Sequence, residues 1–91
     1  MIIDPNKQSF QDNYKLMIGS IVPRPIAFVS TKSKDGIDNV APFSFFNGVC
    51  SNPPTISFCP VRRGSDGQIK DTLKNIQDTG VFSLNIVSES F

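Results

Sequence analysis

The stretch that decides the fold lies in the middle of the chain and reads Asn39-Val40-Ala41-Pro42-Phe43-Ser44-Phe45-Phe46-Asn47. Its β-branched and aromatic residues predict a strand over about residues 39–46. Pro42 has no N–H to donate to a neighbouring strand, so we expect a sheet edge or a bent strand here. Two interpretations of the stretch stay open: a bulged core strand with aromatic packing, or a site where backbone groups face a flat polar heterocycle.

The sequence on either side of this stretch predicts further strands. Residues 26–31 are apolar and β-branched, and their continuous apolar start favours burial on both faces. The turn Lys34-Asp35-Gly36 follows, because Asp-Gly readily adopts the positive φ angles of a tight reversal. A third strand is predicted over residues 55–61 and a fourth over residues 81–87. The order of these segments is typical of an antiparallel sheet.

Two short helices complete the prediction. Apolar residues recur at spacings of three and four between Ser9 and Ser20, which favours one amphipathic helix, and its face includes Tyr14 as a core residue. Ile69, Leu73 and Ile76 mark the apolar face of a second helix, which Gly80 is placed to cap. The fold class is therefore mainly β with short helices (α+β), and the antiparallel part is expected to curl toward a barrel.

Composition excludes several classes of protein. The 91 residues suffice for one domain, and they carry a formal charge of +1, which argues against a nucleic-acid binder. No apolar run is long enough for a membrane helix, and the N-terminus lacks the pattern of a signal peptide, so the cytoplasm is expected. The absence of histidine excludes Ser-His-Asp and Cys-His hydrolases and most zinc enzymes. Cys50 and Cys59 fit neither a redox pair nor a metal site and are expected to be buried.

Two short segments are candidates for binding an anion. The first, residues 62–72, is basic, contains glycine and opens a helix, whose N-terminal N–H groups favour negative charge. Its spacing does not match a P-loop, and for the segment taken alone a solvated loop with Asp71 or Thr72 in a capping role is the favoured interpretation. The second segment, Ser30-Thr31-Lys32, offers two hydroxyls and an ammonium to a phosphate. Strand ends with such residues are common, so this signal is weak by itself.

Several separated motifs together resemble flavin reductase-like, FMN-binding split-barrel proteins. They follow one another in the order and at the spacing usual in that family. The resemblance covers nearly the whole chain, and so many motifs are more specific together than any one of them. The motifs are Tyr14–Thr31, Asn39–Asn47, Asn52-Pro53-Pro54, Lys70-Asp71-Thr72 with Asn75, and Phe82–Asn85.

The resemblance implies a split β-barrel that binds FMN at a homodimer interface, with residues 1–91 as a single flavin reductase-like domain. Family members continue beyond the equivalent of Phe91, so the domain is expected to be incomplete relative to the family and apparently truncated at its C-terminus. By the family pattern, the flavin would be lined by Ala41, Pro42, Phe43, Ser44 and Asn47. The ribityl phosphate would be held by Ser30, Thr31, Lys70 and Thr72, with Arg62 less securely.

The function implied by the resemblance is an FMN-dependent oxidoreductase that passes electrons from NAD(P)H through flavin to an acceptor. Flavin carries the electrons in such proteins, which suits a chain with no histidine and no paired carboxylates. Two alternatives stay open: an electron carrier that does not use NAD(P)H directly, and a non-catalytic fragment. Val81, Phe82, Leu84 and Ile86 exceed what the predicted elements can cover, so a homo-oligomer, most simply a dimer, is expected.

Overall fold

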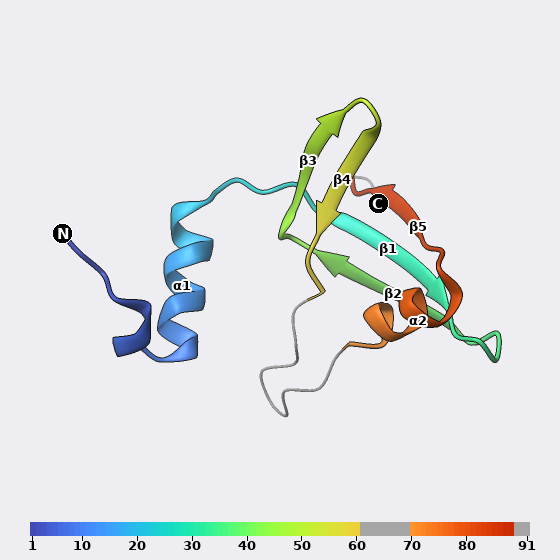
Figure 1. Ribbon diagram of the computed structural model, residues 1–91, viewed down its shortest axis with the longest axis horizontal. Helices are drawn as coiled ribbons and strands as arrows, with labels where there is room; N and C mark the ends of the chain where they lie inside the picture. Colours follow the sequence, from blue (N-terminus) through green and yellow to red (C-terminus); the bar gives the residue numbers. More distant parts are fainter. Residues whose placement is uncertain (61–69, 89–91) are drawn as a thin grey trace.

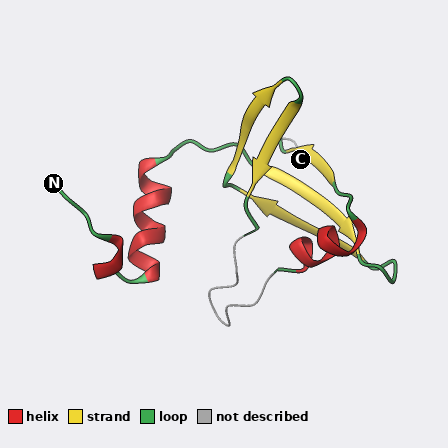
Figure 2. Ribbon diagram, viewed as in Figure 1, coloured by secondary structure: helices red, strands yellow, loops and turns green. Residues whose placement is uncertain are grey.

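The computed structural model describes residues 1–60 and 70–88. Two antiparallel sheets lie next to each other, and a short helix packs beneath the larger one (Figure 1). Figure 2 shows the same arrangement by element type. In chain order the elements are the 3₁₀ helix η1 (Pro5–Lys7), α1 (Phe10–Ser20), β1 (Ala27–Lys32), β2 (Asp38–Phe43), β3 (Phe46–Ser51), β4 (Pro54–Phe58), α2 (Asp71–Thr79) and β5 (Ser83–Ile86).

The larger sheet has the order β2-β1-β5, with both neighbours antiparallel to β1. Val29 lies at its centre, opposite Ala41 on one side and Leu84 on the other. Pro42 therefore belongs to an edge strand of this sheet, as its missing N–H requires. The prediction of a mostly β chain with two short helices and antiparallel pairing is confirmed.

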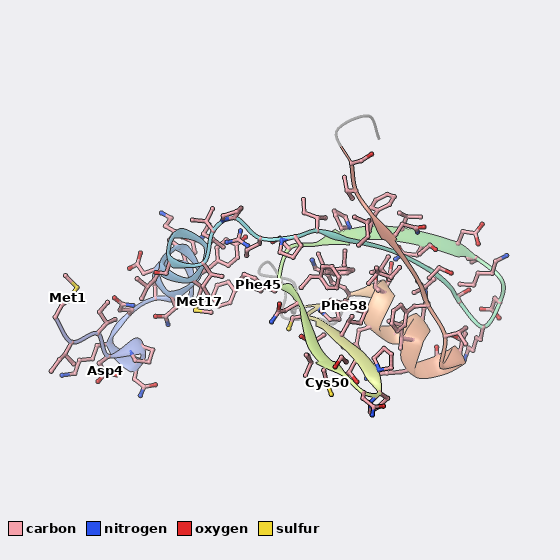
Figure 3. The ribbon with its side chains drawn as sticks, turned by 90° about the horizontal axis from the view of Figure 1, so that it is seen from above. Met1, Asp4, Met17, Phe45, Cys50 and Phe58 are labelled. Atoms are coloured by element: carbon pink, nitrogen blue, oxygen red, sulfur yellow. The ribbon has the colours of Figure 1, made fainter. Side chains whose placement is uncertain are left out.

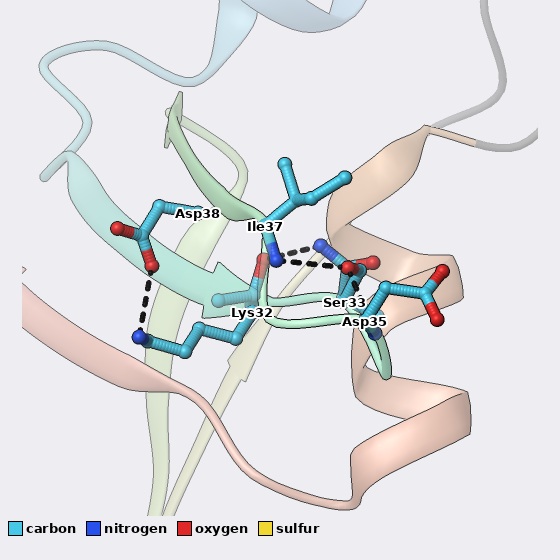
Figure 4. Close-up of polar contacts among 7 residues, drawn as sticks. Lys32, Ser33, Asp35, Ile37 and Asp38 are labelled. Carbon is cyan, nitrogen blue, oxygen red and sulfur yellow. Dashed lines mark hydrogen bonds and ion pairs between the residues drawn. The ribbon is translucent and has the colours of Figure 1, made fainter.

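A tight turn joins β1 to β2 and confirms the Asp-Gly prediction. Gly36 has φ of 84°, a conformation that glycine adopts without the steric cost of a side chain. The Ser33 hydroxyl oxygen accepts hydrogen bonds from the backbone N–H groups of Asp35 and Ile37, as Figure 4 shows. The exposed ion pair between Lys32 and Asp38, 3.4 Å long, flanks the turn and adds little stability at the surface.

The prediction of one strand over residues 39–46 is wrong in one respect: the observed strand, β2, ends at Phe43. The chain bends at Ser44 and Phe45, and residues 46–51 form a separate strand, β3, which pairs with β4. The residues that the structure describes thus form five strands where the sequence predicts four. Phenylalanines lie on both sides of Ser44, so the apolar pattern does not show where one strand stops and the next begins.

The core is small and lies on one side of the larger sheet, which we call the inner face. Ala27, Val29 and Phe43 are buried there. Successive residues of β1 point to opposite sides, so Phe28 and Ser30 face the outer side, where they are half-buried. The predicted burial of β1 is therefore complete on one face and partial on the other. The core is extended by partly buried residues from both sheets: Ala41, Phe46, Phe58 and Leu84.

Helix α1 stands beside the sheets rather than on them (Figures 1 and 3). Its start is as predicted, since the Ser9 hydroxyl accepts a hydrogen bond from the Asp12 N–H in an N-cap. None of its residues is buried. The expectation of a core position for Tyr14 is wrong: the residue is 47% exposed, and its ring contacts Phe45 with centroids 6.2 Å apart. Sequence periodicity identified the helix but not what covers its apolar face.

The described strands form separate sheets of three and two strands, so the expected curl toward a split barrel stays a prediction. The burial predicted for the cysteines is wrong, since both Cys50 and Cys59 are exposed and free. The β3–β4 hairpin extends away from the larger sheet, so most of its residues have no covering layer (Figure 1). Within the described residues, no helix is long and apolar enough to cross a membrane.

Candidate functional site

The candidate site centres on the way α2 is attached to the inner face. The side-chain amide of Asn39, on β2, donates a 3.0 Å hydrogen bond to the Thr72 hydroxyl oxygen on α2. The amide of Asn75, also on α2, donates a 3.0 Å hydrogen bond to the Thr31 hydroxyl oxygen on β1. Both bonds connect segments far apart in sequence. They fix the helix over the two strands that carry five of the ten residues implied by the resemblance.

Polar residues form the buried side of α2, contrary to the apolar pattern. Thr72 and Asn75 are the buried residues of the helix, whereas Leu73 and Ile76 are only half-buried. The prediction located the helix correctly, and Gly80 caps it with φ of 76°, as expected. Apolar spacing could not indicate that hydroxyl and amide groups would face the sheet. The partner residues Asn39 and Asn75 are thus functional candidates that the sequence reasoning did not assign to the site.

Lys70 brings a positive charge to the beginning of α2. It occupies the N-cap position, and its side chain does not cap the helix. Its ammonium nitrogen lies 5.3 Å from the centroid of the Phe43 ring, within the range of a cation–π contact. The helix N-terminus adds partial positive charge, and the Asp71 carboxylate in the first turn offsets part of it. Lys70, a basic residue, and Phe43, an aromatic one, come from separate motifs and meet here.

Five of the ten residues implied by the resemblance lie on this side of the larger sheet. β2 alternates between its faces, so Ala41 and Phe43 point inward together with Asn39. Thr72 is 1% exposed and Thr31 is 6% exposed, so both hydroxyls are enclosed in the attachment of α2. The five residues are Thr31, Ala41, Phe43, Lys70 and Thr72.

The other implied residues lie elsewhere. Because side chains alternate along a strand, Ser30 and Pro42 point to the outer side of the sheet. Ser30 lines a hollow of about 490 Å³ together with Lys32, Val40 and Phe82. Ser44 and Asn47 line a second hollow, also about 490 Å³, between the end of α1 and the bend from β2 to β3. Arg62 lies outside the described residues. The structure does not test the role of any of these residues, and their contact with a flavin stays a prediction.

Arg24 organises the second hollow. Its Nη1 donates hydrogen bonds to the backbone carbonyls of Ile18 (2.9 Å) and Ile21 (2.7 Å), and its guanidinium lies 5.6 Å from the Phe45 ring centroid. The Nε atom is buried and has no hydrogen-bond partner among the described residues. The sequence signal for Arg24 was its position between Pro23 and Pro25, two residues that cannot lie inside a helix. They place Arg24 in the segment that follows α1. Arg24 thus joins the C-terminal end of α1 to the bend at Phe45.

The site contains no candidate metal centre within the described part of the chain, where no three potential His, Cys, Asp or Glu ligands gather. Acidic and basic side chains do line a hollow of about 280 Å³ between the β1–β2 turn and α2, among them Asp35, Lys74 and Asp78. What the inner-face arrangement can offer chemically is a cation beside an aromatic ring, at a helix N-terminus. That combination suits an aromatic ligand that carries an anionic group.

Known structures share the fold of this chain. The crystal structure of nitrilotriacetate monooxygenase component B from Bacillus cereus matches 99% of the chain with 48% identity and a TM-score of 0.88. Pseudomonas fluorescens 2-nitrobenzoate 2-nitroreductase NbaA matches 99% with 33% identity and a TM-score of 0.79. The chain covers 44% and 42% of these two proteins, respectively.

The chain also has sequence relatives of undescribed function. An uncharacterized protein of Halalkalibacterium halodurans is 48% identical over 98% of the chain, and one of Aquifex aeolicus is 55% identical over 84%. The chain spans about two fifths of the length of these relatives, 42% and 38%. The sequence model described as the flavin reductase like domain matches residues 18–91. The chain therefore belongs to the flavin reductase like domain family, a family of flavin-related oxidoreductases.

Proposed function

We propose that this chain contributes the FMN-binding part of an oxidoreductase that passes electrons from NAD(P)H through flavin to an acceptor. The observation that carries the proposal is the meeting of Lys70 and Phe43, 5.3 Å apart, at the N-terminus of α2. Two of the motifs that resemble flavin reductases are brought together there by the fold. Membership in the family supports the flavin, and the charge at this point supports a phosphorylated flavin.

The described residues have the chemistry that FMN requires. Lys70 provides an ammonium for the phosphate, and charge-assisted hydrogen bonds to such groups are among the strongest in proteins. By the resemblance, Ser30, Thr31 and Thr72 would add hydroxyls, and Ala41, Phe43, Ser44 and Asn47 would line the ring system. In the described structure the Thr31 and Thr72 hydroxyls are enclosed beneath α2 and Ser30 lies on the outer side of the sheet, so Lys70 is the group that this proposal assigns to the phosphate. When bound, the flavin supplies the redox chemistry, and the protein supplies its position and its surroundings. That division of roles suits a chain without histidine.

An absorbance spectrum of the purified chain tests the proposal. We expect flavin bands between roughly 350 and 500 nm, the range in which this redox cofactor absorbs, or saturable quenching of FMN fluorescence on titration. Oxidation of NADH or NADPH with FMN present separates the oxidoreductase from a flavin-binding electron carrier. A folded chain that neither contains nor binds flavin would leave the non-catalytic interpretation.

Self-association and location are also part of the proposal. The inward-facing side of β5 carries Leu84 and Ile86, and Phe82 directly precedes the strand. Ile86 remains 69% exposed. Because removal of apolar surface from water favours association, we propose a twofold homodimer, which suits a split-barrel fold with FMN near the contact. Residence in the cytoplasm stays a prediction from the N-terminal sequence.

A further inference from the structure

The attachment of α2 rests on two hydrogen bonds of the same kind. In each, a side-chain amide donates to a threonine hydroxyl, at 3.0 Å, from Asn39 to Thr72 and from Asn75 to Thr31. The two pairs are reversed in direction. The helix contributes the hydroxyl in one pair and the amide in the other.

The spacing of the two bonds restrains α2 in more than one way. Thr72 and Asn75 are three residues apart, so both lie on one side of the helix, about one turn from each other. One bond reaches β2 and the other reaches β1. Contacts with two adjacent strands, one turn apart along the helix, oppose both a slide of α2 along its axis and a rotation about it.

The burial of these groups makes the restraint stiff. Thr31, Thr72 and Asn75 are all less than 7% exposed, so water does not readily replace a broken bond. Few apolar residues support the helix in this position, because Leu73 and Ile76 are only half-buried. The position of α2 therefore depends strongly on the two polar pairs.

Lys70 is the group whose position depends on this restraint. It lies two residues before Thr72, at the end of the helix that faces Phe43. If α2 slides by one residue along its own axis, the helix moves by about 1.5 Å. That shift is enough to separate the Lys70 ammonium from a phosphate held at hydrogen-bond distance.

We propose that Asn39 and Asn75 are positioning residues for the flavin phosphate: by fixing α2 on the sheet they hold Lys70 in place and thereby set the preference for FMN over riboflavin. This inference rests on the proposed function. When the helix is loosened, Lys70 is in the binding position in only a fraction of the molecules. The apparent affinity for FMN is reduced in proportion to that fraction. The loss falls on FMN, because riboflavin has the same ring system and no phosphate for Lys70 to bind.

The test measures dissociation constants for FMN and for riboflavin in the whole chain. Asn39→Ala and Thr72→Val each remove the β2 bond, and the valine keeps the shape of threonine, so at least that variant should fold. Each change is made alone and together with Lys70→Ala. Thr79→Val is the matched control, because the Thr79 hydroxyl bonds the Asn75 carbonyl at the far end of the same helix.

We expect Asn39→Ala and Thr72→Val each to weaken FMN about fivefold and riboflavin less than twofold, the scale of one lost hydrogen bond. In the Lys70→Ala background neither change should weaken FMN further, because both act through Lys70. The control should leave the ratio of the two constants unchanged.

Four other outcomes overturn the inference. Equal losses for FMN and riboflavin would mean a purely structural role, and a loss that persists without Lys70 would mean direct contact with the phosphate. No change in either variant, while Lys70→Ala still weakens FMN, would leave the proposed function standing and the inference wrong. If the unmodified chain binds no FMN, the proposed function fails, and the inference fails with it.

Discussion

The ring of Phe43, the last residue of β2, packs on the ring of Phe58, the last residue of β4, with centroids 5.4 Å apart. Phe58 also contacts the Phe82 ring, edge to face, at 5.1 Å. The two sheets are thus connected through aromatic side chains. Phe43 also faces Lys70, so the same residue serves the core and the candidate flavin site.

Phe58→Ala tests this connection. Its side chain is half-buried, so we expect the free energy of unfolding to fall by about 2 kcal/mol, below the range for fully buried phenylalanines. Urea denaturation followed by circular dichroism measures the change. Val49→Ala, on the exposed hairpin, is the control and should cost less than about 0.5 kcal/mol. Similar losses in both variants would contradict a core that includes Phe58.

Lys70→Ala tests the phosphate site. The loss of a charge-assisted contact should weaken FMN about tenfold while the fold is kept. Fluorescence titration with FMN gives the dissociation constant. Lys74→Ala is the matched control, because it removes the same charge one helical turn further along α2, where the side chain lines a different hollow. An unchanged FMN affinity in Lys70→Ala would remove Lys70 from the site.

Two glycine substitutions should change stability in opposite directions. Gly80 has φ of 76° at the end of α2, so Gly80→Ala should lower the free energy of unfolding by about 1 kcal/mol. Gly19 lies within α1, and a Cβ there would meet no atom within 4 Å, so Gly19→Ala should raise stability by up to about 1 kcal/mol. Denaturation curves measure both. Destabilisation of equal size at the two positions would contradict the assigned backbone conformations.

Sedimentation equilibrium at micromolar concentration tests the proposed dimer. Ile86→Thr reduces the apolar surface of β5 and keeps strand propensity, so it should weaken association. Ile37→Thr, in the β1–β2 turn, is a fair control, because Ile37 is 68% exposed and Ile86 is 69% exposed. A compact, folded monomer in the unmodified chain would contradict the proposal.

Local sequence signals determined much of the fold. Gly80 correctly marked the end of a helix, because capping depends on the residue and its immediate neighbours. Asp35-Gly36 marked the turn and Pro42 the edge strand for similarly local reasons. The motifs of the flavin reductase-like proteins identified the family, which the comparisons confirm. Each of these predictions needed only a few consecutive residues or a fixed order of motifs.

The tertiary structure alone decided what each side chain meets. The sequence could not predict the bend at Ser44, because phenylalanines lie on both sides of it. Nor could it predict that Tyr14 and the two cysteines are exposed. Nor could it pair Asn39 with Thr72, 33 residues away, since a hydrogen bond between distant segments depends on strand register and helix rotation together. The sequence by itself determined both helices, most of the strands and the family. The packing of α2 on the sheet decided that Lys70 lies beside Phe43, because only that packing brings their distant segments together.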